Sequence, residues 1–547
     1  MTEPSSPPPV PVAPVAPVPV EPAVAGSPAP AVRPPRRAAA FAGLAATGAA
    51  IATGELLAGL VPGIPSPILS VGRVVVDLQP PGAKELVVSI FGTADKLALE
   101  VLVLVVALAI GAGLGVLARA RQGLAMGVLG VFVVIGIAAG LRDPGTQPTL
   151  AVLAGLGEYL VGATALDRLM RLVTGRATAA SGATAAPAGG IAATPDWSRR
   201  TLLVRGGGLA LASIAAGAIG RVLLDRQRVP ATGSLPEPEL PVGLPAGADL
   251  GLEGLTPIVV PNQDFYRIDT ALLVPNVDRD SWRLRIHGLV EREVTLSYAD
   301  LLELPVVEQY VTIACVSNRV GGDLIGNARW TGVRLRDVLD LAGVKDGATQ
   351  LVGRSVDDWT AGMPVSWIMD PEREPMIAYG MNGDPLPRQH GFPARLIVPG
   401  LFGYVSATKW LSELELTTME AFDGYWVPLG WSKEAPILTQ SRIDRPRRGA
   451  EIESGTYSFA GMAWAPDRGI ARVEVQVDEG EWREASLSTP ISDATWLQWR
   501  IDWDATPGDH RVRVRATDGA GETQAEAETR PDPDGARGWH TVRFSVA

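Results

Sequence analysis

The chain has 547 residues, a formal net charge of −11 and one cysteine. This length allows several domains. The excess of acidic residues, most of which lie in the C-terminal part, argues against a nucleic-acid-binding protein. A lone cysteine cannot form an internal disulfide, so cysteine usage does not identify the redox compartment.

The N-terminal tail, residues 1–36, consists mainly of Pro, Val and Ala and carries few charges. This composition is typical of a disordered, polyproline-type segment. The next segment, up to about residue 225, is rich in Ala, Gly, Leu and Val, whereas the remainder holds nearly all the Trp and most of the Asp and Glu.

Residues 37–225 contain five apolar stretches, and we predict an α-helical membrane domain of five spans. Each stretch is close to the ~20 residues that a helix needs to cross a bilayer. A buried helix of a soluble protein is the alternative for any one stretch, but five in succession disfavour it. The stretches are Ala38–Val61, Leu97–Leu117, Gly123–Leu141, Thr149–Leu166 and Leu202–Leu224.

Arginines cluster before the first stretch, after the second, and between the fourth and fifth, while the other connections are poorer in Arg and Lys. The positive-inside rule then places the N-terminus in the cytoplasm. Five crossings would put everything after residue 225 on the extracytoplasmic side of the cell membrane.

Three acidic residues lie in or near the predicted spans: Glu55, Glu100 and Glu158. Acids inside a membrane often mark proton or ion paths, but weak, Gly-rich spans also tolerate an acid near an interface. Both interpretations stay open. None of the four histidines lies in a predicted span, so the membrane part lacks the ligands for a bis-histidine haem.

The fifth stretch is preceded by Ser198-Arg-Arg-Thr-Leu-Leu203, which resembles a twin-arginine export signal. Two further positive-inside arginines are the simpler alternative. Residues 226–257 are rich in Pro and Gly and have no periodicity, so we predict a linker.

Residues 258–425 show mixed patterns, which favour an α+β domain. Trp282–His287 alternate apolar and polar residues as a half-buried strand does, and Val333–Ala342 have helical spacing. Thr295–Leu302 indicate a short strand followed by the start of a helix.

Cys315 follows a β-branched run and opens a polar, Gly-containing loop. A free thiol at this place is a buried core residue, a nucleophile or a metal ligand. The residues around it do not decide between these roles by themselves.

Three ordered segments carry a family resemblance: Cys315–Arg319 with Ala328–Leu335, Ile377–Gly400, and Gly403–Trp410. They resemble the metal-ligand, pterin-binding and second pterin-contacting segments of the sulfite oxidase family of molybdenum enzymes. The resemblance spans roughly residues 260–547. It implies a molybdenum-molybdopterin cofactor whose metal takes two sulfurs from the pterin dithiolene and one from Cys315, which suits a soft thiolate.

The resemblance also implies roles for individual residues. Arg395 matches an arginine at the cofactor's phosphate, for which a guanidinium fork is suited. Asp357 is the alternative to Ser355 as a pterin contact, and Trp330 is interpreted as core packing. The implied catalytic residues are Cys315, Arg319 and Trp359; the implied cofactor-binding residues are Asn262, Phe265, Tyr266, Ser355, His390, Arg395, Ser406 and Lys409.

Two positions depart from the family's anion pocket: Val320 and Ile268 stand where sulfite oxidases have arginines. Without those charges the pocket should bind a dianion poorly, although Arg319 remains and Arg468 could supply another cation. We therefore expect a small-molecule substrate other than sulfite. No haem-binding domain is recognisable, so electrons would pass to or from a separate partner, a cytochrome or a quinone.

Residues 426–547 alternate apolar residues along several short segments separated by turns, which predicts an immunoglobulin-like β-sandwich. The family places such a domain here, and in several members it forms the contact of a homodimer.

The leading hypothesis is a membrane-anchored extracytoplasmic molybdopterin oxidoreductase that transfers oxygen atoms and electron pairs. One alternative is a hydrolase or transferase with Cys315 as nucleophile and His390 as its base. Another is a membrane-tethered binding protein without cofactor.

Overall fold

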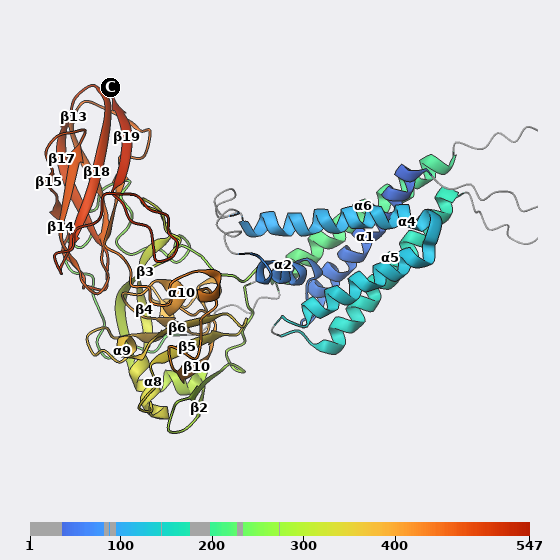
Figure 1. The fold of residues 1–547 in the computed structure, drawn as a ribbon, viewed down its shortest axis with the longest axis horizontal. Helices are drawn as coiled ribbons and strands as arrows, with labels where there is room; N and C mark the ends of the chain where they lie inside the picture. Colours follow the sequence, from blue (N-terminus) through green and yellow to red (C-terminus); the bar gives the residue numbers. More distant parts are fainter. Residues whose placement is uncertain are drawn as a thin grey trace, which may run out of the picture.

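The computed structural model describes residues 35–80, 87, 95–143, 145–174, 197–226, 234–272 and 274–547. The predicted tail up to residue 34 lies outside these ranges, as do the side chains of Ser198 and Arg199. Figure 1 shows three parts: a helical bundle, a domain of strands and short helices beside one end of the bundle, and an all-β domain at the C-terminus. The middle part is called the catalytic domain, after the function expected from its resemblance to the sulfite oxidase family.

All five predicted apolar stretches are helical, and within the described residues four helices are long and apolar enough to cross a membrane. The second and third stretches form one 46-residue element, in which Arg121 has non-helical backbone angles (φ −142°, ψ 71°). The bundle helices are α1 (Arg36–Leu60), α4 (Asp95–Gly140), α5 (Pro148–Thr174) and α6 (Trp197–Arg226).

The break at Arg121 reverses the chain. Gly115, before the break, packs on Ala39 at the start of α1, whereas Gly140, after it, packs on Pro65 beyond the end of α1. Lys96, at the start of α4, also lies at the end that faces the catalytic domain, where it binds Asp269. The two halves of α4 therefore form a hairpin.

Small residues let the bundle helices approach closely. A methyl group built on Gly43 would lie 2.1 Å from the Gly111 carbonyl oxygen, and one on Gly59 would lie 2.2 Å from the Gly220 carbonyl oxygen. Backbone atoms cannot move aside as side chains can. Close packing of small residues is the usual way that helices associate in a membrane.

A further helix, α2 (Pro67–Asp77), was not predicted. Ser66 accepts a hydrogen bond from the Leu69 N–H, and Pro67 occupies the first turn, which together make a strong helix start. Glu55 of α1 accepts hydrogen bonds from the Ser66 hydroxyl (2.7 Å) and the Ile68 N–H (3.1 Å). In Figure 1, α2 lies between the bundle and the catalytic domain.

The catalytic domain has two sheets, one mixed through its parallel β1–β10 pair and one antiparallel, and the predicted segments are confirmed in type. One sheet has the order β2-β1-β10-β5-β6 and the other β3-β4-β7-β8, with β9 paired to β7. The strands are β1 (Arg283–Gly288), β2 (Val294–Ser297), β3 (Val306–Ala314), β4 (Ile325–Arg334), β5 (Gln350–Ser355), β6 (Thr360–Pro364), β7 (Met376–Met381), β8 (Asp384–Pro385), β9 (Arg395–Ile397) and β10 (Leu411–Thr417). The short helices are α7 (Tyr298–Leu302), α8 (Leu335–Ala342), α9 (Val365–Ile368), η2 (Arg388–His390), α10 (Gly403–Ser406) and η3 (Val427–Leu429).

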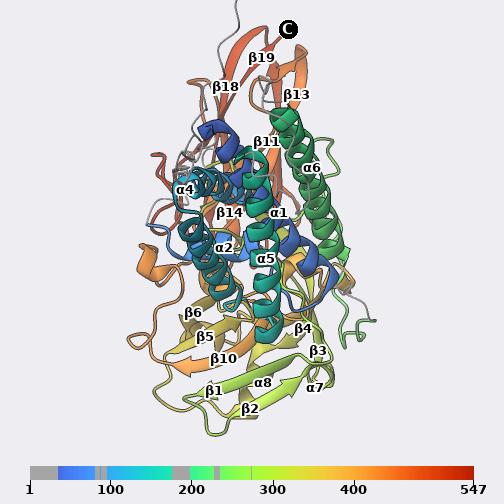
Figure 2. The same ribbon diagram turned by 90° about the vertical axis from the view of Figure 1, so that its right-hand side faces the viewer.

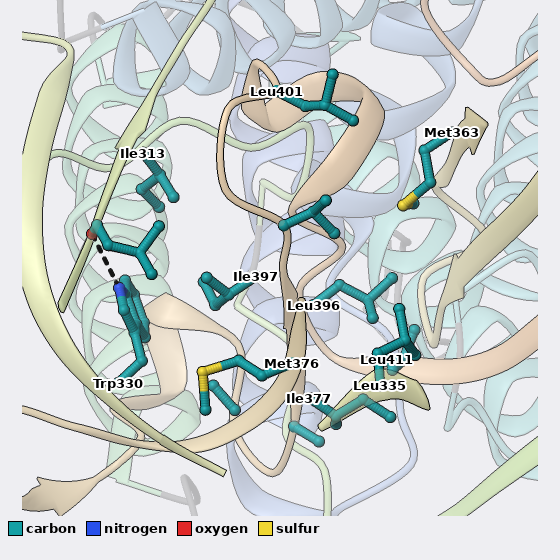
Figure 3. Packing of buried hydrophobic residues seen from close by; sticks show 14 of the residues in the cluster. Ile313, Trp330, Leu335, Met363, Met376, Ile377, Leu396, Ile397, Leu401 and Leu411 are labelled. Atoms are coloured by element: carbon teal, nitrogen blue, oxygen red, sulfur yellow. Dashed lines mark hydrogen bonds between the residues drawn. The ribbon is translucent and has the colours of Figure 1, made fainter. Parts of the chain in front are cut away.

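Trp330 of β4 is fully buried at the centre of this domain and donates its indole N–H to the Val311 carbonyl (3.1 Å). Figure 3 shows it beside aliphatic residues of the same core, including Ile313 and Ile397. The interpretation of Trp330 as core packing is therefore supported by its position, and the core fixes β3 and β4 on either side of the loop that carries Cys315.

The C-terminal domain consists of two packed sheets, of order β11-β13-β17-β16 and β12-β19-β18-β14-β15. Figure 2 shows its long strands rising away from the catalytic domain. Residues 234–257 of the predicted linker contain no helix or strand and bind both domains, since the Leu250 N–H donates to Gln498 and Leu235 packs on the catalytic core. The strands are β11 (Gln440–Arg445), β12 (Glu451–Ile452), β13 (Gly455–Trp464), β14 (Ile470–Val477), β15 (Arg483–Glu484), β16 (Ser486–Leu487), β17 (Leu497–Ala505), β18 (Gly508–Asp518) and β19 (His540–Val546).

Candidate active site

A cavity of about 830 Å³ lies in the catalytic domain with Cys315 in its wall. The cysteine directly follows β3, and its N–H donates to the Leu324 carbonyl (2.9 Å), which closes the loop. The C-terminal domain steadies the same strand, because the Thr312 N–H donates to the Ala494 carbonyl (3.0 Å) and the Thr312 hydroxyl accepts from the Trp496 N–H (2.8 Å). The thiol is thus held at a defined place.

Two of the predicted cofactor-binding cations line this cavity, Arg395 and Lys409. Arg395 is 2% exposed and donates to the His390 carbonyl (2.9 Å). Burial lowers its pKa to about 10. Burial also lowers the pKa of Lys409 to about 8, although the neighbouring Asp269 carboxylate favours the charged amine.

Asp269 was not among the predicted site residues, and it binds several cations at the cavity. Its carboxylate accepts from Lys409 Nζ (3.0 Å), from Arg267 Nε (3.2 Å) and from Lys96 of the bundle. Burial alone would raise its pKa, but these three cations hold it well below the ordinary range. Three cations therefore surround this carboxylate, and Arg395 lines the same cavity; cationic side chains of this kind suit a phosphate group.

Phe265, Tyr266 and Ser355 also line the cavity, as predicted. Phe265 stacks on Tyr266 with ring centroids 5.3 Å apart. Burial, reinforced by the nearby Cys315, raises the pKa of Tyr266, so its hydroxyl stays protonated. Ser355 is followed by Asp357, whose pKa is raised by burial.

Three predicted cofactor contacts do not line the cavity: Asn262, His390 and Ser406. His390 Nε2 lies 2.9 Å from the Asn262 carbonyl oxygen, which can only accept, and the Asn262 side chain is bonded to Asn382 (2.9 Å) and the Met381 carbonyl. The Ser406 hydroxyl donates to the Phe402 carbonyl (3.0 Å). These side chains hold the loops that carry the cavity-lining residues.

The position of His390 also weakens the hydrolase hypothesis. Its ring is 2% exposed and packs edge-on against Phe265. Burial, together with the charges of Lys409 and Arg395, lowers its pKa to about 3. A base that must take a proton from a thiol near neutral pH needs a pKa near 7.

The wall of the cavity also contains Arg319 and Trp359, as predicted, and Ile268. Arg468, considered as a further cation there, instead binds Asp518 (2.9 Å) and Asp467 and does not line the cavity. The C-terminal domain contributes a different segment, Glu528–Asp532, within which Arg530 pairs with Asp532 (2.9 Å). Sequence spacing could not reveal this segment, because it reaches the cavity through the packing of two domains.

Aromatic side chains that the sequence analysis did not select complete the wall. They are Tyr404, Trp410, Trp426 and Trp431. Each was visible as an aromatic near the second pterin-like segment or just beyond it, but nothing in its spacing separated it from ordinary core residues.

Two buried polar atoms at the cavity have no hydrogen-bond partner within the described structure, Arg395 Nε and Asp357 Oδ1. Buried polar atoms are nearly always satisfied, so both suit a polar ligand. A phosphate would satisfy the guanidinium, and a pterin ring, rich in N–H groups, would satisfy the carboxylate. The donor set therefore fits molybdopterin, with Cys315 as the soft ligand for the metal.

Comparisons with known proteins agree with this geometry. The model of the oxidoreductase molybdopterin binding domain matches residues 271–426, and that of the Mo-co oxidoreductase dimerisation domain matches residues 434–542. The chain is 34% identical over 290 residues to mitochondrial sulfite oxidase of Mus musculus, covering 44% of this chain and 52% of that protein. It is 28% identical over 318 residues to nitrate reductase [NADH] 1 of Oryza sativa subsp. japonica, covering 46% of this chain and 34% of that protein.

The chain thus spans about half the length of the mammalian relatives that it matches. Sulfite oxidase of Arabidopsis thaliana is matched more completely, at 30% identity over 276 residues, which cover 42% of this chain and 70% of that protein. The chain belongs to the sulfite oxidase family of molybdenum cofactor-dependent oxidoreductases, and its cofactor is molybdenum-molybdopterin.

Proposed function

We propose that this protein is a membrane-anchored extracytoplasmic oxidoreductase that transfers an oxygen atom and two electrons between a small substrate and its molybdenum centre. The observation that carries the proposal is the single cavity that joins Cys315 to the buried cations Arg395 and Lys409. When bound, the cofactor supplies the redox chemistry. The protein supplies the thiolate, holds the phosphate and excludes water through the aromatic wall.

The lining residues that are not assigned to the cofactor favour a substrate of low net charge with some apolar surface. Arg319 and Arg530 are balanced by Glu528 and Asp532, and the rest of this wall includes aromatic residues. Ile268, at a position where the family's sulfite oxidases have an arginine, adds apolar surface. A dianion would find little net positive charge here, so sulfite is not the proposed substrate.

The proposed topology has five spans, because the hairpin break at Arg121 divides α4 into two membrane-length segments. The arginine-rich connections would lie in the cytoplasm, and Ser198–Leu203 would act as a twin-arginine signal for the folded catalytic domain. The proposed domains are 37–225, 258–425 and 426–547, with the last an immunoglobulin-like sandwich. Its match to a dimerisation model supports a homodimer.

The proposal requires a separate electron carrier, either a cytochrome or a membrane quinone. Reduction of a substrate by removal of one oxygen atom consumes two electrons and two protons and releases water. Oxidation of a substrate runs the same exchange in reverse. The carrier supplies the electron pair when the substrate is reduced and accepts it when the substrate is oxidised.

The test is a substrate screen on the purified full-length protein, followed through the electron paramagnetic resonance signal of Mo(V). Dialkyl sulfoxides and amine N-oxides should reoxidise the reduced centre, and at equal concentration they should react faster than sulfite reduces the oxidised centre. If sulfite is the fastest compound, the substrate proposal fails. If the protein from a molybdenum-replete host contains no molybdenum, the whole proposal fails.

A further inference from the structure

The bundle, together with helix α2 that packs on it, contacts two of the segments that line the cofactor cavity. Arg73 of α2 donates to the Asp357 carbonyl, and its guanidinium lies 4.0 Å from the Asp358 carboxylate. Lys96 of α4 donates to the Asp269 carboxylate and to the Ala271 carbonyl (2.7 Å). Both Asp357 and Asp269 line the cavity. Among the described residues, the buried core of the catalytic domain includes none from the bundle, so these contacts do not serve that core.

Arg73 is itself fixed by the bundle. Asp143, which follows α4, binds both the Arg73 guanidinium (3.2 Å) and the Ser70 hydroxyl one turn earlier on α2. The start of α2 is held by the Glu55 carboxylate. Gly72 packs so closely that a methyl group built on it would lie 2.8 Å from Leu272 Cδ1, three residues after Asp269. Helix α2 is therefore held in place by contacts along its length.

Lys96 shares the charge of Asp269 with Lys409. The Asp269 side chain is 6% exposed, and the Lys409 side chain is 12% exposed, so their attraction is weakly screened by water. Without Lys96, the carboxylate would interact more strongly with Lys409 and compete with a phosphate for the same amine. Lys96 thus keeps the positive charge of Lys409 available to the cofactor.

We propose that the membrane bundle positions the cofactor site, with Arg73 holding residues 355–359 and Lys96 holding Asp269 and, through it, Lys409. Arg73 and Lys96 are positioning residues because neither lines the cavity. The inference rests on the proposed binding of the cofactor phosphate by Lys409. It explains why Glu55 is buried in the bundle: its carboxylate anchors α2, while Glu100 pairs with Arg221 (2.8 Å). The proposal assigns no role to Glu158.

The test uses the full-length protein in detergent, purified from a host that makes the cofactor. Lys96→Met and Arg73→Met should each lose molybdenum and pterin about five- to tenfold faster than wild type, the size expected for one charge-assisted hydrogen bond. Lys96→Arg should restore retention. Arg285→Met is the matched control, since Arg285 pairs with the exposed Glu293 (2.9 Å) and neither residue lines the cavity.

Hydrogen exchange distinguishes positioning from general destabilisation. Amides of residues 266–272 and 355–359 should exchange faster in both variants, while those of strand β14 should not change. Equal acceleration everywhere would overturn the proposal.

If either variant does not accumulate, Gly72→Phe keeps both cations but pushes α2 from Leu272, and it should give the same local loss. Wild-type retention in the loaded variants refutes the inference alone; absence of molybdenum from wild type refutes the proposed function.

Discussion

The bundle and the catalytic domain place their large apolar residues on opposite sides. Val105 and Ile214 of the bundle are 56% and 69% exposed, and the bundle interior is mostly alanine and glycine. In the catalytic domain, Trp330 and the aliphatic residues around it are fully buried. This arrangement fits the proposed membrane location of the bundle, because lipid favours apolar surface outside and close backbone packing inside, whereas water favours burial of large side chains. One chain therefore folds by two different packing rules.

The large-residue core of the catalytic domain holds the loop that carries Cys315, and Cys315→Ser tests whether this thiol is essential to the chemistry. Loss of the soft ligand should reduce turnover on the order of 10³-fold, as removal of an essential catalytic group does. Steady-state assay with the best substrate from the screen measures the loss. Membrane insertion and the thermal midpoint of the bundle should be unchanged; retained turnover would show that the thiol is not a ligand.

The packing rule of the bundle is tested by two glycines on the same helix. Gly115→Leu should disrupt the bundle, because a methyl group there would lie 2.0 Å from the Ala39 carbonyl oxygen. Gly113→Leu is the control, since nothing lies within 4 Å of its added methyl group. The thermal midpoint in detergent should fall strongly in the first and by less than a few degrees in the second. Equal midpoints would contradict the helix contact.

In the catalytic domain, a smaller side chain in the core should destabilise the fold, whereas in the bundle a larger one should do so. Trp330→Ala should cost about 3–5 kcal/mol of unfolding free energy, because it opens a cavity and leaves the Val311 carbonyl without its donor. Trp330→Phe keeps most of the volume and should cost less. Denaturant unfolding of the full-length protein measures both. A cost below about 1 kcal/mol for the alanine variant would place Trp330 outside the rigid core.

A further effect should appear on acidification, because burial lowers the pKa of His390 to about 3 and that of His540 to about 4. The unfolded chain binds protons at its ordinary histidine pKa of about 6.5, so stability should fall as the pH drops from about 6.5 towards 4. Each histidine should contribute up to about 1.4 kcal/mol per pH unit. Denaturant midpoints across this window measure the slope.

His390→Gln should remove about half of that slope. The amide can still donate to the Asn262 carbonyl but does not titrate. An unchanged slope would mean that His390 is protonated in the folded protein, contrary to its buried environment.

Much of this organisation could be predicted from sequence because its signals are local. Apolar length indicated the bundle helices, alternation indicated the C-terminal strands, and the Cys315 loop with the 377–410 segment indicated the cofactor. The sequence also contained the start signal of α2, Ser66-Pro67, but its short apolar run was not distinguished from a connection.

What could not be predicted depends on contacts between distant parts. Asp269 was inconspicuous because its three cations come from positions 96, 267 and 409. Arg468 was selected by its place in the last domain, yet Asp518 holds it elsewhere, and Arg530 reaches the cavity instead. His390 and Arg395 are only five residues apart, but one supports a loop and the other lines the cavity.

Molybdenum K-edge X-ray absorption on the full-length protein tests the central claim most directly, because it counts the sulfur ligands of the metal. We expect three sulfurs in wild type, two from the dithiolene and one from Cys315, and two in Cys315→Ser. The same sulfur count in both proteins would contradict it, since Cys315 would then not be the ligand that organises the site.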